Sequence, residues 1–237
     1  EDVDTLVVGG GQAGLAMSEH LSNCGLPHLV LERHRIAERW RSQRWDSLVT
    51  NGPAWHDRFP GMEFPGAGPA DFVAKERVAD YFVAYAEKIA APIRCGVEVT
   101  EVRRQDGQPG FRIETSQGII KARSVVAATG PFQQPAIPAL VPADAGLLQI
   151  HSSAYRNPGQ LPPGHLAVGP LDRPPRAYRE RDFCWWLGVL GKWDLQTPGP
   201  GTEHVTIAVS GAHGGYTIDF RRLAERGMTL VGRAESY

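Results

Sequence analysis

The chain has 237 residues, a formal net charge of -1 and three cysteines. This charge balance argues against nucleic acid or an anionic membrane as partner, since no positive field would recruit either. Cys24, Cys95 and Cys184 lie far apart without a CxxC pair, which argues against a disulfide framework, a zinc site and a dithiol centre and suits a reducing cytoplasm. No stretch approaches the roughly 20 apolar residues of a membrane span, and a strand at the very start predicts no retained signal peptide.

The first 32 residues predict a strand, a helix and a second strand. Residues 5–8 form a short apolar run stopped by glycines, as expected of a buried parallel strand. Apolar residues then recur at helical spacing between positions 13 and 21, and Gly25 follows as a helix stop. Residues 28–31 predict a second buried strand, which ends at Glu32.

The middle of the chain alternates between loop, helix and strand patterns. Residues 33–69 are rich in Trp, Arg, Gly and Pro and predict mostly loop, whereas residues 78–89 carry one apolar helical face. Three short runs predict a small antiparallel meander, at residues 97–102, 111–115 and 118–121. A separate buried strand is expected at residues 124–128.

The second half is less regular. Residues 131–164 are rich in proline and predict an interdomain connection. A strand at 205–210, glycines at 211–215, a helix at 218–226 and a strand at 229–231 together predict a second βαβ-like unit.

The glycines between the first strand and helix carry the strongest functional signal. Gly9 permits a tight turn, Gly11 lets the backbone approach a pyrophosphate, and Gly14 lets helix and strand pack closely. Gln12 and Ala13 begin the helix, whose N-terminal N–H groups and dipole attract phosphates. The pattern therefore predicts dinucleotide binding, the alternative being an ordinary glycine-rich turn.

Glu32 strengthens this prediction. It ends the second strand, where a carboxylate can accept hydrogen bonds from a ribose diol. The glycine spacing alone does not distinguish FAD from NAD.

Five segments decide between the two cofactors through a resemblance. They are GGGQAG, LERHRIAERW, SLVTNGP, ATGPFQQPAIP and HSSAYRNP, in this order over about the first two-thirds of the chain. Together they resemble the class B flavin monooxygenases, which include the flavin-containing monooxygenases and the bacterial N-hydroxylases. The resemblance implies an α/β fold: a doubly wound Rossmann-type FAD-binding domain at residues 1–156 and a partial NADPH-binding domain at residues 157–237.

The resemblance also assigns roles around the flavin. Glu32 would hold the adenosine ribose, with Arg33 beside it among the cofactor-binding residues. Arg39 and Trp40 would lie along the flavin. The pair Thr129-Gly130 would pass close to the pyrophosphate side.

Asn51 and His151 carry two further implied roles. Asn51 matches the catalytic asparagine beside the isoalloxazine, although an Asn-Gly-Pro turn without a ligand is the alternative. His151 matches the histidine that links the two domains, with a purely structural histidine as the alternative. The fingerprint around it is half present, because Leu147 stands where glycine is expected, one place after Gly146, and Ala145 replaces an aromatic residue.

The pattern breaks where a second GxGxxG motif would begin. Residues 161–164 run directly into 165–169, although a βαβ crossover needs at least about 10–12 residues between its strands. The sequence therefore predicts either omitted segments, so that residues 164 and 165 are not covalent neighbours, or a truncated protein. Arg173 and Arg176 would meet the 2′-phosphate of NADPH or else form a solvated loop, and the GxxGG turn at 211–215 is a weaker phosphate candidate.

The resemblance implies an FAD- and NADPH-dependent cytoplasmic monooxygenase. It would transfer one oxygen atom from O2, by way of a C4a-hydroperoxyflavin, to a nitrogen or sulfur of a small molecule. A flavin-dependent oxidase or reductase that releases peroxide and a non-catalytic flavin-binding remnant remain the alternatives. The substrate, a homo-oligomeric state and the choice of NADPH over NADH stay open.

Overall fold

The computed structural model describes residues 1–105, 107–131, 133–142, 144–167, 171–196, 199 and 206–232. The chain packs into two compact units, each assembled from separate stretches of sequence. The first comprises Glu1–Arg44, Phe59–Met62 and Lys75–Pro135, and the second comprises Trp45–Arg58, Glu63–Ala74 and Ala136–Tyr237. The boundary expected between residues 156 and 157 falls within the second unit, and the division into two cofactor domains stays a prediction.

A six-stranded mixed sheet organises the first unit. Its strands are β1 (Asp2–Val8), β2 (His28–Glu32), β3 (Ile93–Cys95), β4 (Val99–Arg104), β5 (Phe111–Thr115) and β6 (Gly118–Ala127). Their order across the sheet is β3-β2-β1-β6-β5-β4. β3, β2, β1 and β6 run parallel, whereas β5 and β4 are antiparallel to their neighbours. This arrangement confirms the predicted α/β fold.

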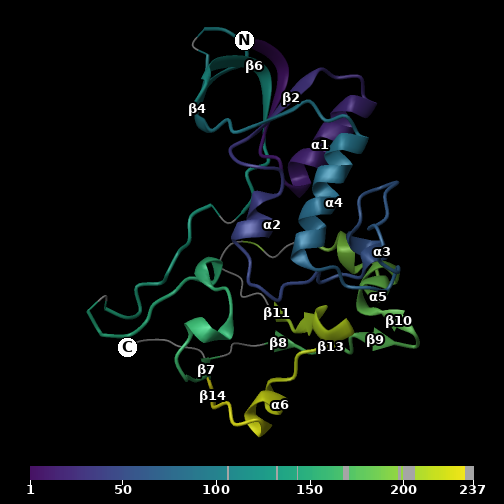
Figure 1. Cartoon of the computed structure of the whole chain (residues 1–237), viewed down its shortest axis with the longest axis vertical. Helices are drawn as coiled ribbons and strands as arrows, with labels where there is room; N and C mark the ends of the chain where they lie inside the picture. The colour runs from purple at the N-terminus through teal and green to yellow at the C-terminus, as the bar shows by residue number, and fades with distance from the viewer. Residues whose placement is uncertain are drawn as a thin grey trace. The chain divides into compact units, whose positions relative to one another are not determined.

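Two helices connect the parallel strands. α1 (Gln12–Asn23) lies between β1 and β2 in the chain, and α4 (Lys75–Lys88) precedes β3; the two helices lie side by side (Figure 1). α1 stops at Gly25, whose φ of +66° suits glycine and whose N–H donates to the Ser22 carbonyl at 2.9 Å. The Leu26 N–H donates to the Leu21 carbonyl at 2.9 Å, which completes the stop predicted at Gly25.

The strands at the centre are buried on both faces. Leu6 pairs with Leu29, and the next pair, Val7 with Val30, points to the opposite face; Leu6, Val7 and Val30 are fully buried. Two-sided burial explains why the sequence of these strands is continuously apolar. One face carries the cluster Leu6, Leu29, Leu31, Val97, Ile113, Ile120 and Ala122.

Two strand predictions need correction. The strands expected at 118–121 and 124–128 are a single strand, β6, whose first half pairs with β5 and whose second half pairs with β1. β3 was not predicted, because three residues with an arginine at the centre give no apolar run. The stretch expected to be mostly loop, residues 33–69, contains two short helices, α2 (Glu38–Ser42) in the first unit and α3 (Ala54–Asp57) in the second.

The second unit is built from short elements. After α3 its helices are η1 (Ser152–Ala154), η2 (Pro158–Gln160), α5 (Phe183–Val189), η3 (Lys192–Asp194), η4 (Ala212–Gly214) and α6 (Phe220–Glu225). Its strands are β7 (Leu166–Ala167), β8 (Leu171–Asp172), β9 (Ala177–Tyr178), β10 (Arg181–Asp182), β11 (Thr206–Ile207), β12 (Val209–Ser210), β13 (Tyr216–Thr217) and β14 (Leu230–Val231). The described strands pair two by two, as β10-β9, β11-β8, β12-β13 and β14-β7.

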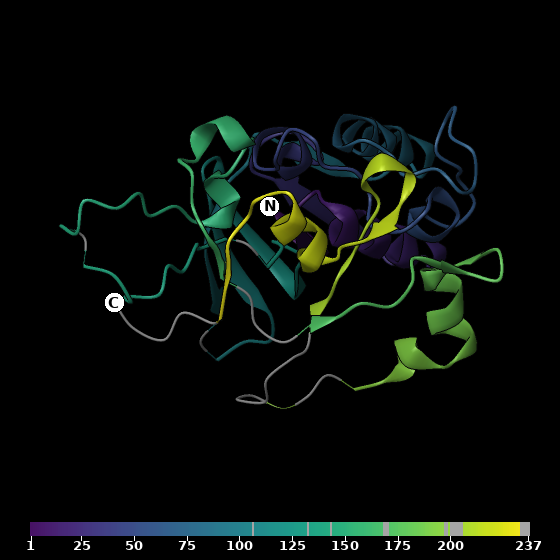
Figure 2. The ribbon, with the colours of Figure 1, turned by 90° about the horizontal axis from the view of Figure 1, so that it is seen from below.

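This pairing overturns the second βαβ-like unit expected from the sequence. β12 pairs with β13 in antiparallel fashion, while β14 pairs with β7, so the strands on either side of α6 belong to different sheets. The expected first residue of that unit, Val205, lies outside the described residues. Before β7, the described part of the connection after β6 contains no helix besides η1 and η2 and otherwise runs without regular structure, as its prolines predict (Figure 2). Among the described residues, none of the helices has the length and hydropathy needed to cross a bilayer.

Candidate cofactor site

The glycine-rich turn follows β1 and leads into α1. Gly9 has a φ of +116°, and a Cβ there would lie 2.3 Å from the Ala128 carbonyl oxygen. A Cβ at Gly14 would lie 1.9 Å from the Gly9 carbonyl oxygen. Both positions therefore require glycine because strand, turn and helix pack too closely for a side chain.

Gly11 is different. A Cβ at this position would meet no atom of the described residues within 4 Å, and its backbone is extended, at φ -95° and ψ -165°. Nothing in the described packing of the turn demands glycine at this position. Open space at the N-terminus of a helix is what a phosphate group needs in order to approach the backbone.

The first turn of α1 suits an anion. Gln12 and Ala13 are exposed, and Gly11 is the N-cap without a side chain to bond the first N–H groups. The first turn also carries no acidic residue. The helix dipole therefore faces this space without a carboxylate from the helix's own first turn competing for it.

Glu32 supports the turn from the end of β2. Its Oε2 accepts the Gly10 N–H at 2.7 Å, and its Oε1 accepts the His34 N–H at 2.9 Å. A carboxylate offers about four acceptor positions, so two bonds leave capacity for a ribose diol. Arg33 instead forms an ion pair with Glu98 at 3.3 Å, with both side chains about half exposed.

α2 brings a second group of predicted residues to the turn. The Ala37 N–H donates to the Gly10 carbonyl at 3.2 Å, and Ala37 itself is left-handed at φ 58°. Arg39 donates from Nη2 to Oε1 of Gln133 at 2.9 Å. Trp40 packs edge-on against Phe82 of α4, with 6.1 Å between ring centroids.

A second arginine lies close to Trp40. The Arg44 guanidinium carbon is 5.6 Å from the Trp40 ring centroid, which is within cation–π range. Burial, together with the positive charge of Arg39, lowers the pKa of Arg44. Two guanidinium groups, those of Arg39 and Arg44, are thus close enough here for one to affect the pKa of the other.

Thr129 and Gly130 follow β6 at the same edge of the sheet. The Ala128 N–H donates to the Val8 carbonyl at 2.9 Å, so the two chains stay paired up to the glycine turn. Gly130 has a φ of +83°, and both Thr129 and Gly130 are exposed. Because β1, β2 and β6 are parallel, their carboxyl ends bring the glycine turn, Glu32 and Thr129 together.

The other predicted site residues lie in the second unit. Asn51 is exposed, and its loop is fixed on both sides. Before it, the buried Thr50 donates its N–H to the Val73 carbonyl at 2.8 Å and accepts the Val73 N–H on Oγ1 at 3.0 Å. After it, the Gly52 N–H donates to Oδ2 of Asp57 at 3.0 Å. Asn51 thus lies in a loop that hydrogen bonds hold on both sides.

His151 has a local structural role. Its Nδ1 accepts the Ser153 N–H at 3.1 Å and lies 2.9 Å from the Ser153 hydroxyl, which caps η1. These are the hydrogen bonds expected of a structural histidine. Its expected link between domains stays a prediction.

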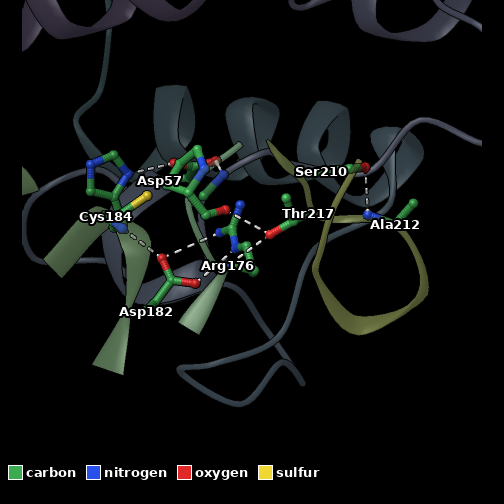
Figure 3. Close-up of polar contacts among 10 residues, drawn as sticks. Asp57, Arg176, Asp182, Cys184, Ser210, Ala212 and Thr217 are labelled. Carbon is green, nitrogen blue, oxygen red and sulfur yellow. Dashed lines mark hydrogen bonds and ion pairs between the residues drawn. The ribbon is translucent and has the colours of Figure 1, made fainter. Parts of the chain in front are cut away.

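The two predicted phosphate-binding arginines have different surroundings. Arg173 donates to Oδ1 of Asp219 at 2.8 Å and is 38% exposed. Arg176 is 7% exposed and forms a two-bond ion pair with Asp182, at 2.9 and 3.3 Å (Figure 3). Its guanidinium carbon lies 4.6 Å from the Phe72 ring centroid. The buried Arg176 thus belongs to an ion pair within the second unit. Arg173 is the more accessible of the two arginines.

Gln133 was not among the predicted residues. It lies inside the matching segment ATGPFQQPAIP, but its partner Arg39 is 94 residues away. Residue type and spacing give no signal for such a contact. A glutamine between Pro131 and Pro135, just after Gly130, is the one feature of the sequence that could have drawn attention to it.

Comparison with known proteins agrees with this geometry. The pyridine nucleotide-disulphide oxidoreductase family matches residues 6–168. An uncharacterized CzcO-like oxidoreductase of Geobacillus kaustophilus is 40% identical over 168 residues, which are 70% of this chain and 47% of that protein. A probable indole-3-pyruvate monooxygenase of Arabidopsis thaliana, YUCCA4, is 28% identical over 158 residues, covering 64% of this chain and 37% of that protein.

Solved structures point the same way. A mutant flavin monooxygenase of Stenotrophomonas maltophilia aligns with a TM-score of 0.62 and 29% identity, over 72% of this chain and 52% of that one. The chain spans about half the length of the curated relatives that it matches. The chain therefore belongs to the pyridine nucleotide-disulphide oxidoreductase family, and its relatives confirm the class B flavin monooxygenase resemblance.

Proposed function

We propose that the first unit binds FAD at the carboxyl ends of β1, β2 and β6. One observation carries this proposal: Gly11 leaves open space before α1, whereas Gly9 and Gly14 are glycines for reasons of packing. A glycine that the protein does not need for its own packing is what a bound pyrophosphate would need.

The residues around this space fit the parts of the cofactor. The N–H groups of the first turn of α1 would bind the pyrophosphate. Glu32 would accept hydrogen bonds from the adenosine ribose, and the Arg39 guanidinium would add positive charge at the same edge. Thr129 and Gly130 are exposed, which permits close approach.

For the whole protein we propose NADPH- and O2-dependent oxygenation of a small molecule at nitrogen or sulfur, in the cytoplasm. The bound flavin supplies the oxygen chemistry, while the protein positions and shields it. Asn51 offers an amide that can donate and accept without acting as a base. Arg173 would meet the 2′-phosphate of NADPH. The family and the monooxygenase relatives support this proposal.

A non-catalytic flavin-binding protein is the second candidate. It is favoured by the second unit, whose described strands are two residues long and pair only two by two. A Rossmann-type nucleotide domain would instead present a parallel sheet of several strands.

Gly11→Val tests the flavin site. The Cβ of the valine would meet none of the described residues within 4 Å, and its methyl groups would occupy the space before α1, so we expect a folded protein that purifies without the yellow absorbance of flavin. Gly164→Val is the matched control, because among the described residues a Cβ there meets only the Pro162 carbonyl, at 3.9 Å. Equal flavin content in wild type and Gly11→Val would show that the glycine-rich turn is not part of the cofactor site.

The reaction is tested separately, with NADPH, O2 and amine or thioether substrates. Oxygenated product in step with NADPH consumption supports the monooxygenase. Stoichiometric peroxide without product indicates an oxidase or reductase. Bound flavin that NADPH does not reduce supports the non-catalytic protein.

A further inference from the structure

Gln133 joins two parts of the first unit that are far apart in sequence. Its Oε1 accepts a hydrogen bond from Nη2 of Arg39 in α2, at 2.9 Å. Its Nε2 donates to the carbonyl oxygen of Thr129, in the turn after β6. One amide therefore links the arginine of α2 to the backbone beside the glycine turn.

The segment around Gln133 is suited to hold it in place. Pro131 and Pro135 restrict the backbone on either side. Gly130 adopts a φ of +83°, and a Cβ at this position would lie 4.0 Å from Nε2 of Gln133. The amide thus lies directly over the turn that Gly130 makes.

An amide has an electrostatic advantage over a carboxylate in this position. It fixes the direction of the Arg39 guanidinium but adds no negative charge, whereas a glutamate would cancel the charge of its partner. Arg39 lies at the edge where the dinucleotide phosphates would bind. A neutral acceptor therefore orients the arginine at no cost to its attraction for an anion.

We propose that Gln133 is a positioning residue of the flavin site, which holds the Arg39 guanidinium against the turn after β6 for binding of the dinucleotide. This inference rests on the proposed function, FAD binding by the first unit. Gln133 need not touch the cofactor itself.

A double-mutant cycle tests the proposal by fluorescence titration of the apoprotein with FAD. Gln133→Met removes both hydrogen bonds at similar size, and we expect the Kd for FAD to rise about 3- to 10-fold. Gln134→Met, at the exposed neighbouring glutamine, is the matched control and should change Kd less than about 2-fold. In an Arg39→Met background, Gln133→Met should add less than about 2-fold, because its effect passes through Arg39.

Gln133→Glu provides a second, electrostatic readout. The carboxylate keeps an acceptor for Arg39 but reduces the positive charge at the site. We expect weaker FAD binding at low ionic strength and a loss, relative to wild type, that shrinks as salt screens the added charge. The loss caused by Gln133→Met should depend much less on salt.

Several results would overturn the inference. They are unchanged affinity in Gln133→Met, equal losses in Gln133→Met and Gln134→Met, or losses that simply add in the double mutant. If Gly11→Val also abolishes flavin binding, such a result rejects the role of Gln133 and leaves the flavin site intact. Retention of flavin by Gly11→Val would reject the proposed site, and the role of Gln133 with it.

Discussion

Two glycine-rich turns in this molecule follow a strand, and they use glycine differently. In the first unit, Gly11 leaves open space in front of a helix of three turns. In the second unit, a Cβ at Gly211 would lie 2.0 Å from the Thr50 carbonyl oxygen, and one at Gly215 would lie 2.7 Å from the Phe72 ring. The first turn keeps space for a ligand, whereas the second closes against its own unit.

The spacing of glycines alone does not distinguish a turn that leaves space for a ligand from a turn that packs against its own unit. Both turns attract attention as phosphate-binding candidates, because in the sequence each has glycines between a predicted strand and a predicted helix. The two turns differ in the atoms that a Cβ at each glycine would meet. In the second turn these atoms belong to the same unit, so packing explains Gly211 and Gly215 without any ligand.

Gly14→Ala should have the largest effect. Its Cβ would lie 1.9 Å from the Gly9 carbonyl, so helix and strand must separate, at a cost of about 3 kcal/mol or more in the free energy of unfolding. Denaturant unfolding followed by tryptophan fluorescence measures this loss. Gly11→Ala is the control and should stay within about 1 kcal/mol of wild type. Similar stability of the two variants would contradict the contrast within the turn.

Asn51→Ala, made in the whole protein, should uncouple the proposed reaction. NADPH would still be consumed, but peroxide would replace part of the product. The loss of one hydrogen bond to a polar oxygen in a dry site is worth about 1.5–3 kcal/mol, or about 10- to 150-fold in the ratio of product to peroxide. Asn23→Ala, at another exposed asparagine, controls for the substitution.

An unchanged ratio of product to peroxide would make Asn51 a turn residue only. If Asn51→Ala instead stops NADPH from reducing the flavin, its amide serves the nicotinamide. The two outcomes are separated by measuring flavin reduction without O2.

Gly211→Ala should cost about 1–3 kcal/mol in the free energy of unfolding, because its Cβ pushes on the loop that carries Asn51. Flavin content should not change. Gly164→Ala is the matched control, since its Cβ makes only an ordinary contact. If Gly211→Ala instead keeps wild-type stability but loses a bound nucleotide, the second turn is a ligand site.

Cysteine labelling gives the smallest and most local test of the second unit. Burial, and then the nearby carboxylate of Asp182, raise the pKa of Cys184 to about 12, so its thiol stays protonated well above pH 8 (Figure 3). At pH 8, iodoacetamide should label the exposed Cys24 first and Cys184 only after unfolding. Equal labelling of both in the native protein, read by mass spectrometry, would contradict the packing around Cys184.

The sequence predicted the first unit well because its signals are local. Buried strands produce continuous apolar runs, and the glycine turn, α1 and Glu32 follow within one short stretch. β6 was divided in two at Ala122 and Arg123, because charged residues on either side of Ala122 interrupt its apolar pattern. Only the pairing, antiparallel in one half and parallel in the other, explains why these positions still belong to a strand.

The second unit was predicted less well for a physical reason. Two-residue strands are shorter than any periodicity, so their pairing depends on tertiary contacts. The proposed role of Gln133 likewise depends on a tertiary contact, its hydrogen bond with Arg39 of α2. Arg176 shows another limit, because its residue type indicated a phosphate contact, which stays a prediction, and gave no sign of its bond to Asp182 six residues later.

The position of β1 between β2 and β6 has a consequence for the protein during synthesis. Asp2 pairs with Lys121, so one edge of the central strand waits for a partner about 120 residues later in the chain. At a translation rate of about 5–20 residues per second, that wait lasts about 6–24 s. During this time the strand that leads into the glycine turn has an open edge on the ribosome, where chaperones or a neighbouring nascent chain can reach it.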